Sequence, residues 1–119
     1  MNEKILLVDD NPRTRKDIAL FLRTKGYEVN EAGNGNEALQ LLENSKYDLV
    51  LSDILMPKLD GFGLLEAMRS LVPDIPVLVM SGVGGIDASQ VITRGATDLI
   101  LKPFELNALF SKVKAALEG

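Results

Sequence analysis

Cysteine and histidine are both absent from this sequence of 119 residues, and each absence excludes a class of chemistry. Without cysteine the chain forms no disulfide framework and offers no thiolate metal ligand, which suits a reducing cytoplasm. Without histidine it has no Ser-His-Asp triad, no imidazole zinc ligand and no histidine that accepts a phosphoryl group. Chemistry at any site must therefore come from carboxylates, hydroxyls and lysines.

Positive charge and long apolar runs are also scarce. The chain has 13 Lys and Arg against 17 Asp and Glu, a net charge of −4, whereas nucleic-acid binding depends on clustered Lys and Arg. Apolar runs such as residues 5–8 and 77–80 are far too short to span a bilayer. We therefore expect one cytoplasmic domain over residues 1–119 that binds neither nucleic acid nor a membrane.

Short apolar runs alternate with amphipathic stretches along the chain. Several of the runs are apolar at consecutive positions, which is typical of strands buried on both faces of a parallel sheet. The run at 27–31 alternates instead, which favours an edge position. The predicted strands are residues 4–8, 27–31, 49–52, 76–80 and 99–101.

The stretches between the runs carry helical periodicity. Pro12 suits a first helical position after Asn11 as N-cap, and Gly26 suits a C-terminal stop, which predicts a helix over residues 12–24. Further helices are predicted around Ala38 to Leu42, from Asp60-Gly61 to before Pro73, and over 87–94, where Val91 and Ile92 are the main apolar residues. In the last helix the expected inward stripe is Leu106, Phe110, Val113 and Leu117.

Strict alternation of strands and helices predicts a parallel sheet with right-handed crossovers. A sheet of this kind with five strands usually takes the doubly wound order 2-1-3-4-5, a flavodoxin-like three-layer α/β sandwich. Its ligands bind at the carboxyl ends of the strands, around the first and third. The polar residues expected at that edge are Asp9, Asp10, Asp53, Ser81 and Lys102.

Three carboxylates that converge at one edge repel each other unless a cation lies between them, and Mg²⁺ prefers such hard oxygen ligands. A carboxylate beside a metal can attack phosphorus and form an acyl phosphate, which makes Asp53 a candidate nucleophile. Lys102 and Ser81 would supply a cation and a hydroxyl donor for phosphoryl oxygens. Taken singly, each of these residues is more often a solvated turn, loop or helix-cap residue than part of a site.

Together these residues resemble the receiver domain of bacterial two-component response regulators, the chemotaxis response regulator among them, over residues 4–117. The resemblance rests on Leu7-Val8-Asp9-Asp10, Asp53 with Met56-Pro57 and Asp60-Gly61, Ser81, Gly95-Ala96 and Lys102-Pro103-Phe104. It implies a phosphorylation-controlled signalling domain that assists its own phosphorylation and dephosphorylation, and not a conventional enzyme.

The resemblance also implies individual roles and partners. A sensor histidine kinase or phosphotransfer protein would donate the phosphoryl group to Asp53, with Ser81 and Lys102 in contact with it. Mg²⁺ would be held by Asp9, Asp10, Asp53 and the backbone carbonyl of Leu55, and the bond before Pro103 would be cis. A downstream partner or a second copy of the chain would bind to the fourth helix, fifth strand and fifth helix.

The resemblance also bears on three apolar positions. Leu99 stands where an aromatic residue is usual, so the switch through Ser81 and Leu99 is expected to be a repacking of apolar side chains. Leu55 and Val83 flank the approach of water to the phosphoryl group, by the same resemblance. Because neither side chain can orient water, we expect a long-lived acyl phosphate.

Three rival functions fit the sequence less well. A phosphatase of the haloacid dehalogenase type would carry a second Asp two residues after its nucleophile, where Asn11 stands. A flavin or nucleotide binder would have a loop rich in Ser, Thr or Gly after the first strand, and Asp9-Asp10 would repel phosphate there. A pseudo-receiver that docks partners without phosphorylation is favoured only by Leu99.

Overall fold

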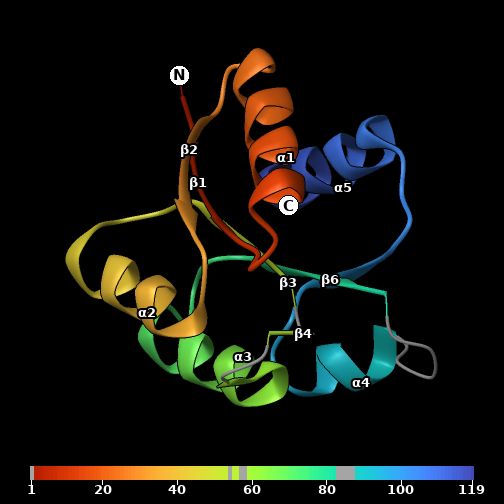
Figure 1. Cartoon of the computed structure of the whole chain (residues 1–119). Helices are drawn as coiled ribbons and strands as arrows, with labels where there is room; N and C mark the ends of the chain where they lie inside the picture. Colours follow the sequence, from red (N-terminus) through yellow and green to blue (C-terminus); the bar gives the residue numbers. More distant parts are fainter. Residues whose placement is uncertain (1, 54, 57–58, 83–87) are drawn as a thin grey trace.

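The computed structural model of the chain describes residues 2–53, 55–56, 59–82 and 88–119. Its centre is a parallel sheet of five strands in the order β2-β1-β3-β6-β7 (Figure 1). These strands are β1 (Lys4–Val8), β2 (Glu28–Ala32), β3 (Leu49–Asp53), β6 (Val77–Ser81) and β7 (Asp98–Leu101). Counted along the chain this is the order 2-1-3-4-5, so the predicted doubly wound fold is confirmed. Among the described residues, no helix is both long and apolar enough to cross a bilayer.

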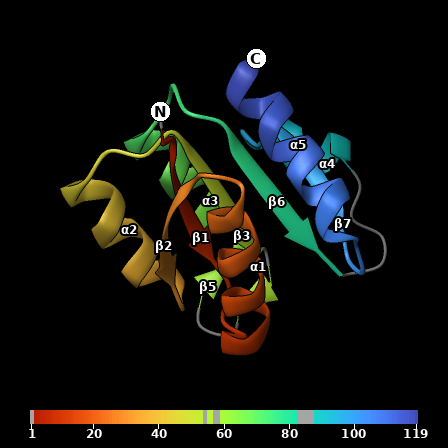
Figure 2. The ribbon, with the colours of Figure 1, turned by 90° about the horizontal axis from the view of Figure 1, so that it is seen from above.

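Helices cover both faces of the sheet, as a three-layer sandwich requires. One face carries α1 (Pro12–Thr24) and α5 (Leu106–Glu118), and the other carries α2 (Gly35–Asn44), α3 (Gly61–Leu71) and α4 (Ala88–Thr93) (Figure 1). In the view from above, α1 and α5 lie in front of the sheet (Figure 2).

Side chains of each strand alternate between two buried clusters. In β1, Ile5 and Leu7 pack with side chains of α1 and α5, whereas Leu6 and Val8 pack with those of α2 and α3. Because both faces of a strand are buried, both sets of alternate positions are apolar. This is the physical reason for the consecutive apolar runs in the sequence.

The start and end of α1 match the sequence signals. The side chain of Asn11 accepts hydrogen bonds from the amides of Arg13 and Thr14, at 3.0 and 3.1 Å, which satisfies donors at the helix N-terminus. After Thr24 the chain turns at Gly26, whose φ of 95° favours glycine. The loop of residues 9–11, between β1 and α1, therefore ends at a capped helix N-terminus.

The inward face of α5 differs from the predicted stripe. Leu109 and Val113 are fully buried, whereas Leu106 is 38% exposed. Phe110 packs sideways against Phe21 of α1, with ring centroids 6.4 Å apart, instead of pointing at the sheet. Val113 was thus predicted correctly, whereas Leu109, and not Leu106 or Phe110, is the other fully buried side chain of this face.

Smaller differences concern element ends. A short antiparallel pair, β4 (Leu55–Met56) and β5 (Leu59–Asp60), follows β3 and was not predicted. Ile92 of α4 is 49% exposed, so only Val91 of the predicted pair is a core residue. Asp53 and Ser81 are the last residues of their strands, one position beyond the predicted strand ends. Sheet pairing therefore positions both side chains.

Candidate functional site

Asp9, Asp10 and Asp53 lie together at the carboxyl ends of β1 and β3. Each offers one carboxylate oxygen, and these oxygens lie within 4.8 Å of one another. The strands are neighbours with Val8 opposite Ser52, so the residues that follow these two are adjacent. Asp9 and Asp53 are buried and Asp10 is exposed. The structure thus brings the three predicted carboxylates into one acidic cluster.

Asp9 is the most constrained member of the acidic cluster. Its side chain is fully buried, and its Oδ1 accepts a 2.9 Å hydrogen bond from the amide of Asn11. Its Oδ2 has no hydrogen-bond partner among the described residues and lies 3.5 Å from Lys102 Nζ. Burial raises the pKa of Asp9 above its usual value, although the Asn11 amide and the Lys102 ammonium oppose this rise.

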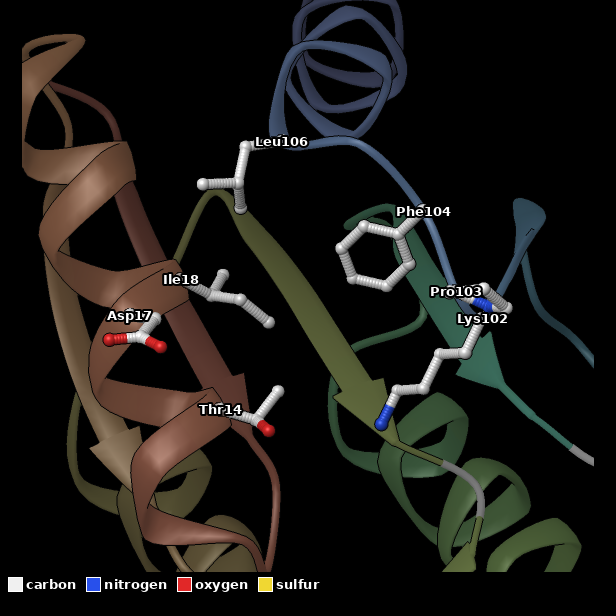
Figure 3. Close-up of a pocket in the computed structure, with 7 residues that line it drawn as sticks. All are labelled: Thr14, Asp17, Ile18, Lys102, Pro103, Phe104 and Leu106. Carbon is white, nitrogen blue, oxygen red and sulfur yellow. The ribbon is translucent and has the colours of Figure 1, made fainter.

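Lys102 reaches into the acidic cluster from the end of β7, and its side chain extends to the end of β3 (Figure 3). Its Nζ donates a 2.8 Å hydrogen bond to Asp53 Oδ2. Burial would lower the pKa of Lys102, but the hydrogen bond from its ammonium to Asp53 and the charges of Asp53 and Asp9 outweigh it and raise this pKa. Lys102 is therefore a charged ammonium between two buried carboxylates.

The backbone holds Lys102 in this position. Its amide donates a 2.8 Å hydrogen bond to the carbonyl of Ser81, which continues the pairing between β6 and β7. The Lys102–Pro103 peptide bond is cis. Ser81 is buried at the end of β6, the strand beside β3. Its hydroxyl, the Asp53 carboxylate and the Lys102 ammonium thus belong to one edge of the sheet.

The remaining predicted residues are Leu99, Leu55 and Val83. Leu99 is 7% exposed and belongs to the buried cluster that contains Val91 of α4. Leu55 begins β4, but its side chain lies outside what the structure describes, and so does all of Val83. The two residues proposed to flank the water approach are therefore not placed.

Sequence reasoning missed one residue that contacts the site loop. Arg15 of α1 donates a 2.9 Å hydrogen bond from Nη1 to the backbone carbonyl of Asp9. Its Nε donates to Glu31 of β2 at 3.1 Å. The sequence held no specific signal for this contact, because every residue has a backbone carbonyl.

The donor set of the acidic cluster fits a hard divalent cation. Mg²⁺ takes carboxylate oxygens and keeps several of its waters, so it needs only a few protein ligands. Buried polar atoms nearly always have a partner, and a carboxylate oxygen without one is suited to a cation. Asp9 Oδ2 is such an atom. An exposed carboxylate at Asp10 leaves one side of the cluster open to water.

Comparisons with known proteins agree with this geometry. A sequence model of the family described as "Response regulator receiver domain" matches residues 5–114. Transcriptional activator protein PfeR of Pseudomonas aeruginosa is 40% identical over 115 residues, which is 96% of this chain and 37% of that protein. Response regulator MprA of Mycobacterium sp. is 37% identical over 124 residues, which is 98% of this chain and 51% of that protein. The chain thus spans about half or less of these curated relatives.

Solved structures give the same result. A CheY-like response regulator receiver domain protein from Methanospirillum hungatei JF-1 matches with a TM-score of 0.93 and 31% identity, over 99% of this chain and 95% of that one. The receiver domain of NtrX from Brucella abortus matches with a TM-score of 0.90 and 37% identity, over 96% of this chain and 98% of that one. With its sheet order, its acidic cluster and these matches, the chain belongs to the response regulator receiver domain family.

Proposed function

We propose that this domain accepts a phosphoryl group on Asp53 from a sensor histidine kinase or a phosphotransfer protein, in a reaction that depends on Mg²⁺. The observation that carries the proposal is the 2.8 Å contact between Lys102 Nζ and the Asp53 carboxylate inside a cluster of carboxylates. An ammonium already beside the acceptor oxygen is placed to pair with a phosphoryl oxygen after transfer.

In this reaction a carboxylate oxygen of Asp53 attacks phosphorus and forms the new O–P bond. The N–P bond of the donor phosphohistidine breaks, and its electron pair stays on the imidazole nitrogen. Lys102 then exchanges part of its contact with Asp53 for a phosphoryl oxygen, and the Ser81 hydroxyl donates to another. Both residues are fixed to the same sheet edge as Asp53, so little rearrangement is needed to reach the phosphoryl group.

Asp9, Asp10, Asp53 and the backbone carbonyl of Leu55 are the proposed ligands of Mg²⁺. When bound, the ion neutralises charge on the phosphoryl oxygens. Without it, the carboxylates repel both each other and an incoming phosphoryl group, and the single ammonium of Lys102 faces two buried carboxylates. The reaction should therefore require the divalent ion.

The donor protein is proposed to dock beside the site, between α1 and the connection from β7 to α5. A cavity of about 500 Å³ lies there (Figure 3). It is lined by Thr14, Asp17, Ile18, Lys102, Pro103, Phe104 and Leu106. Because Lys102 forms part of its wall, a partner seated in this cavity is close to the acceptor carboxylate.

The output surface is proposed to be the face formed by α4, β7 and α5. Two of these elements contribute an exposed apolar side chain, namely Ile92 of α4 and Leu101 of β7, which are 49% and 58% exposed. Phosphorylation would bias this face through Ser81 and Leu99, and a downstream partner or a second copy of the chain would bind it. The switch at Leu99 would be a repacking of apolar side chains against Val91.

We further propose that residues 1–119 act as one receiver domain in the cytoplasm. With a net charge of −4, the domain itself is not expected to hold nucleic acid or a membrane surface. A rival phosphatase of the haloacid dehalogenase type is disfavoured, because Asn11 stands two residues after Asp9, where that type would carry its second Asp.

Phosphorylation with acetyl phosphate and Mg²⁺, followed by intact mass spectrometry, tests the proposal. The wild-type protein should gain one phosphoryl group, and Asp53→Asn should gain none. Asp74→Asn is a matched control, because it removes an exposed carboxylate at the opposite end of the sheet, before β6. Equal labelling of wild type and Asp53→Asn, or labelling that persists in EDTA, would contradict the proposal.

A further inference from the structure

Arg15 ties the loop that carries Asp9 and Asp10 to strand β2. Its Nη1 donates to the Asp9 carbonyl at 2.9 Å and its Nε donates to Glu31 Oε1 at 3.1 Å. The side chains of Arg15 and Glu31 are only 17% and 24% exposed. Shielding from solvent strengthens both contacts relative to a surface ion pair.

The contact at the Asp9 carbonyl bears directly on Asp10. A peptide unit is planar, so a carbonyl oxygen held in place also fixes the amide nitrogen of the next residue. Asn11, on the other side, is fixed as the N-cap of α1, and its amide donates to Asp9 Oδ1. Asp10 is exposed, so its carboxylate depends on this backbone for its direction.

We infer that Arg15 is a positioning residue for the metal site, which it serves by fixing the peptide between Asp9 and Asp10. The inference rests on the proposed Mg²⁺ site and adds to it a residue that touches no ligand oxygen of the acidic cluster. A carboxylate already aimed at the ion loses less conformational freedom when the ion binds, so the affinity for the ion rises.

Simple electrostatics predicts that removal of Arg15 raises the affinity for Mg²⁺, whereas loss of positioning lowers it. The guanidinium is a positive charge near a cation site, and its loss should strengthen cation binding. Positioning and charge therefore predict changes of opposite sign in Mg²⁺ affinity. This difference in sign makes the role of Arg15 testable.

Arg23 provides a matched control for charge. It belongs to the same helix and contacts the same Glu31, through Oε2 at 3.4 Å, and it also donates to the Val29 carbonyl at 2.8 Å. Its hydrogen bonds within the described residues thus reach β2 and not the loop. Arg23→Met removes the same charge as Arg15→Met and leaves the Asp9 carbonyl held.

Gly33 allows a second perturbation that keeps every charged side chain. A Cβ built at Gly33 would lie 3.2 Å from Arg15 Nη1, which is closer than ordinary packing allows. The backbone of Gly33 has no positive φ, so alanine is not strained there. Gly33→Ala should therefore shift the guanidinium by a few tenths of an ångström and weaken its hold on the Asp9 carbonyl.

Calorimetric titration with MgCl₂ at constant ionic strength tests the inference. Loss of a residue that orients a metal ligand typically weakens metal binding about ten-fold or more, so the dissociation constant of Arg15→Met should rise by about ten-fold. Arg23→Met should bind Mg²⁺ at least as tightly as wild type. The dissociation constant of Gly33→Ala should rise, as in Arg15→Met, but by a smaller factor. In the metal-free protein, the Asp10 amide NMR signal should move in Arg15→Met and stay in place in Arg23→Met.

Unchanged or tighter Mg²⁺ binding by a cooperatively folded Arg15→Met would overturn the inference while the metal site stands. If Arg15→Met does not fold, Arg15→Lys serves instead, because one ammonium cannot span the Asp9 carbonyl and Glu31 as the guanidinium does. It should also weaken binding, although it keeps the charge. Absence of Mg²⁺ binding by the wild-type protein would refute the proposed metal site and the inference with it.

Discussion

Replacement of Asp9 by asparagine should stabilise the metal-free protein. Asp9 is fully buried, and its Oδ2 has no hydrogen-bond partner among the described residues. Asparagine has nearly the same shape, keeps an oxygen for the Asn11 amide and removes the buried charge. Lys102 keeps its 2.8 Å contact with Asp53 in the variant.

The size of the effect follows from the cost of a buried polar group without a partner, which is about 1–3 kcal/mol. Lys102, 3.5 Å from Oδ2, already offsets part of this cost, and the new amide group is also buried. We therefore expect the free energy of unfolding to rise by about 1–2 kcal/mol, near the lower end of that range. For a domain of this size such a change raises the melting temperature by about 4–8 °C.

The stabilisation of the protein by Asp9→Asn should depend on pH. Burial raises the pKa of Asp9 in the folded state above that of the unfolded chain. As the pH rises, the unfolded chain therefore loses this proton first, at about pH 4, and stability falls until the pH exceeds the folded pKa. The difference in the free energy of unfolding between Asp9→Asn and wild type should thus be small below about pH 4. It should widen as the pH rises and then stay constant.

Urea unfolding in EDTA across this pH range measures this difference in free energy directly. Asp10→Asn is the control, because Asp10 is exposed and its substitution should change stability by less than about 0.5 kcal/mol in the stabilising direction. Asp10→Asn should nevertheless abolish Mg²⁺ binding. A variant Asp9→Asn that is no more stable than wild type at neutral pH, or a difference that narrows as the pH rises, would refute the reasoning.

Three further predictions concern the same edge of the sheet. Lys102→Met leaves two buried carboxylates without their ammonium. In urea titrations with EDTA, its free energy of unfolding should be lower than that of wild type by about 2–4 kcal/mol. Mg²⁺ should restore most of this loss. Beryllofluoride, a phosphoryl mimic, should shift amide NMR signals of α4, β7 and α5; shifts confined to the site loops would contradict the proposed output surface. Leu55→Asn with Val83→Glu should speed phosphate loss several-fold in a time course, and an unchanged rate would show that these side chains do not control access of water.

The layer architecture and the strand order could be predicted because burial on both faces leaves a direct trace in the sequence. Consecutive apolar residues in β1, β3 and β6 predict a covered parallel sheet, and the intervening helices restrict its topology. The inward face of α5 left no comparable trace in the sequence. Leu109 and Phe110 are both large and apolar, but only Leu109 is fully buried, whereas Phe110 contacts Phe21 of α1.

The acidic cluster could be predicted for a related reason. In a parallel sheet the position of a strand end is set by topology, so Asp9 and Asp53 converge once the strand order is known. The side chains need no further information to meet, because each directly follows or ends a buried strand.

The role inferred for Arg15 could not be predicted in this way, because its partner in the loop is a backbone carbonyl. Every residue has such a group, so no residue type at position 9 signals that its carbonyl will be held. Glu31 gives no better signal, since an acidic residue on an edge strand is ordinarily solvated. Only the close approach of α1, β2 and the loop turns these common groups into a specific contact. Residues that bind an ion or a phosphoryl group are thus visible as residue types, whereas residues that orient them through the backbone become visible only in the fold.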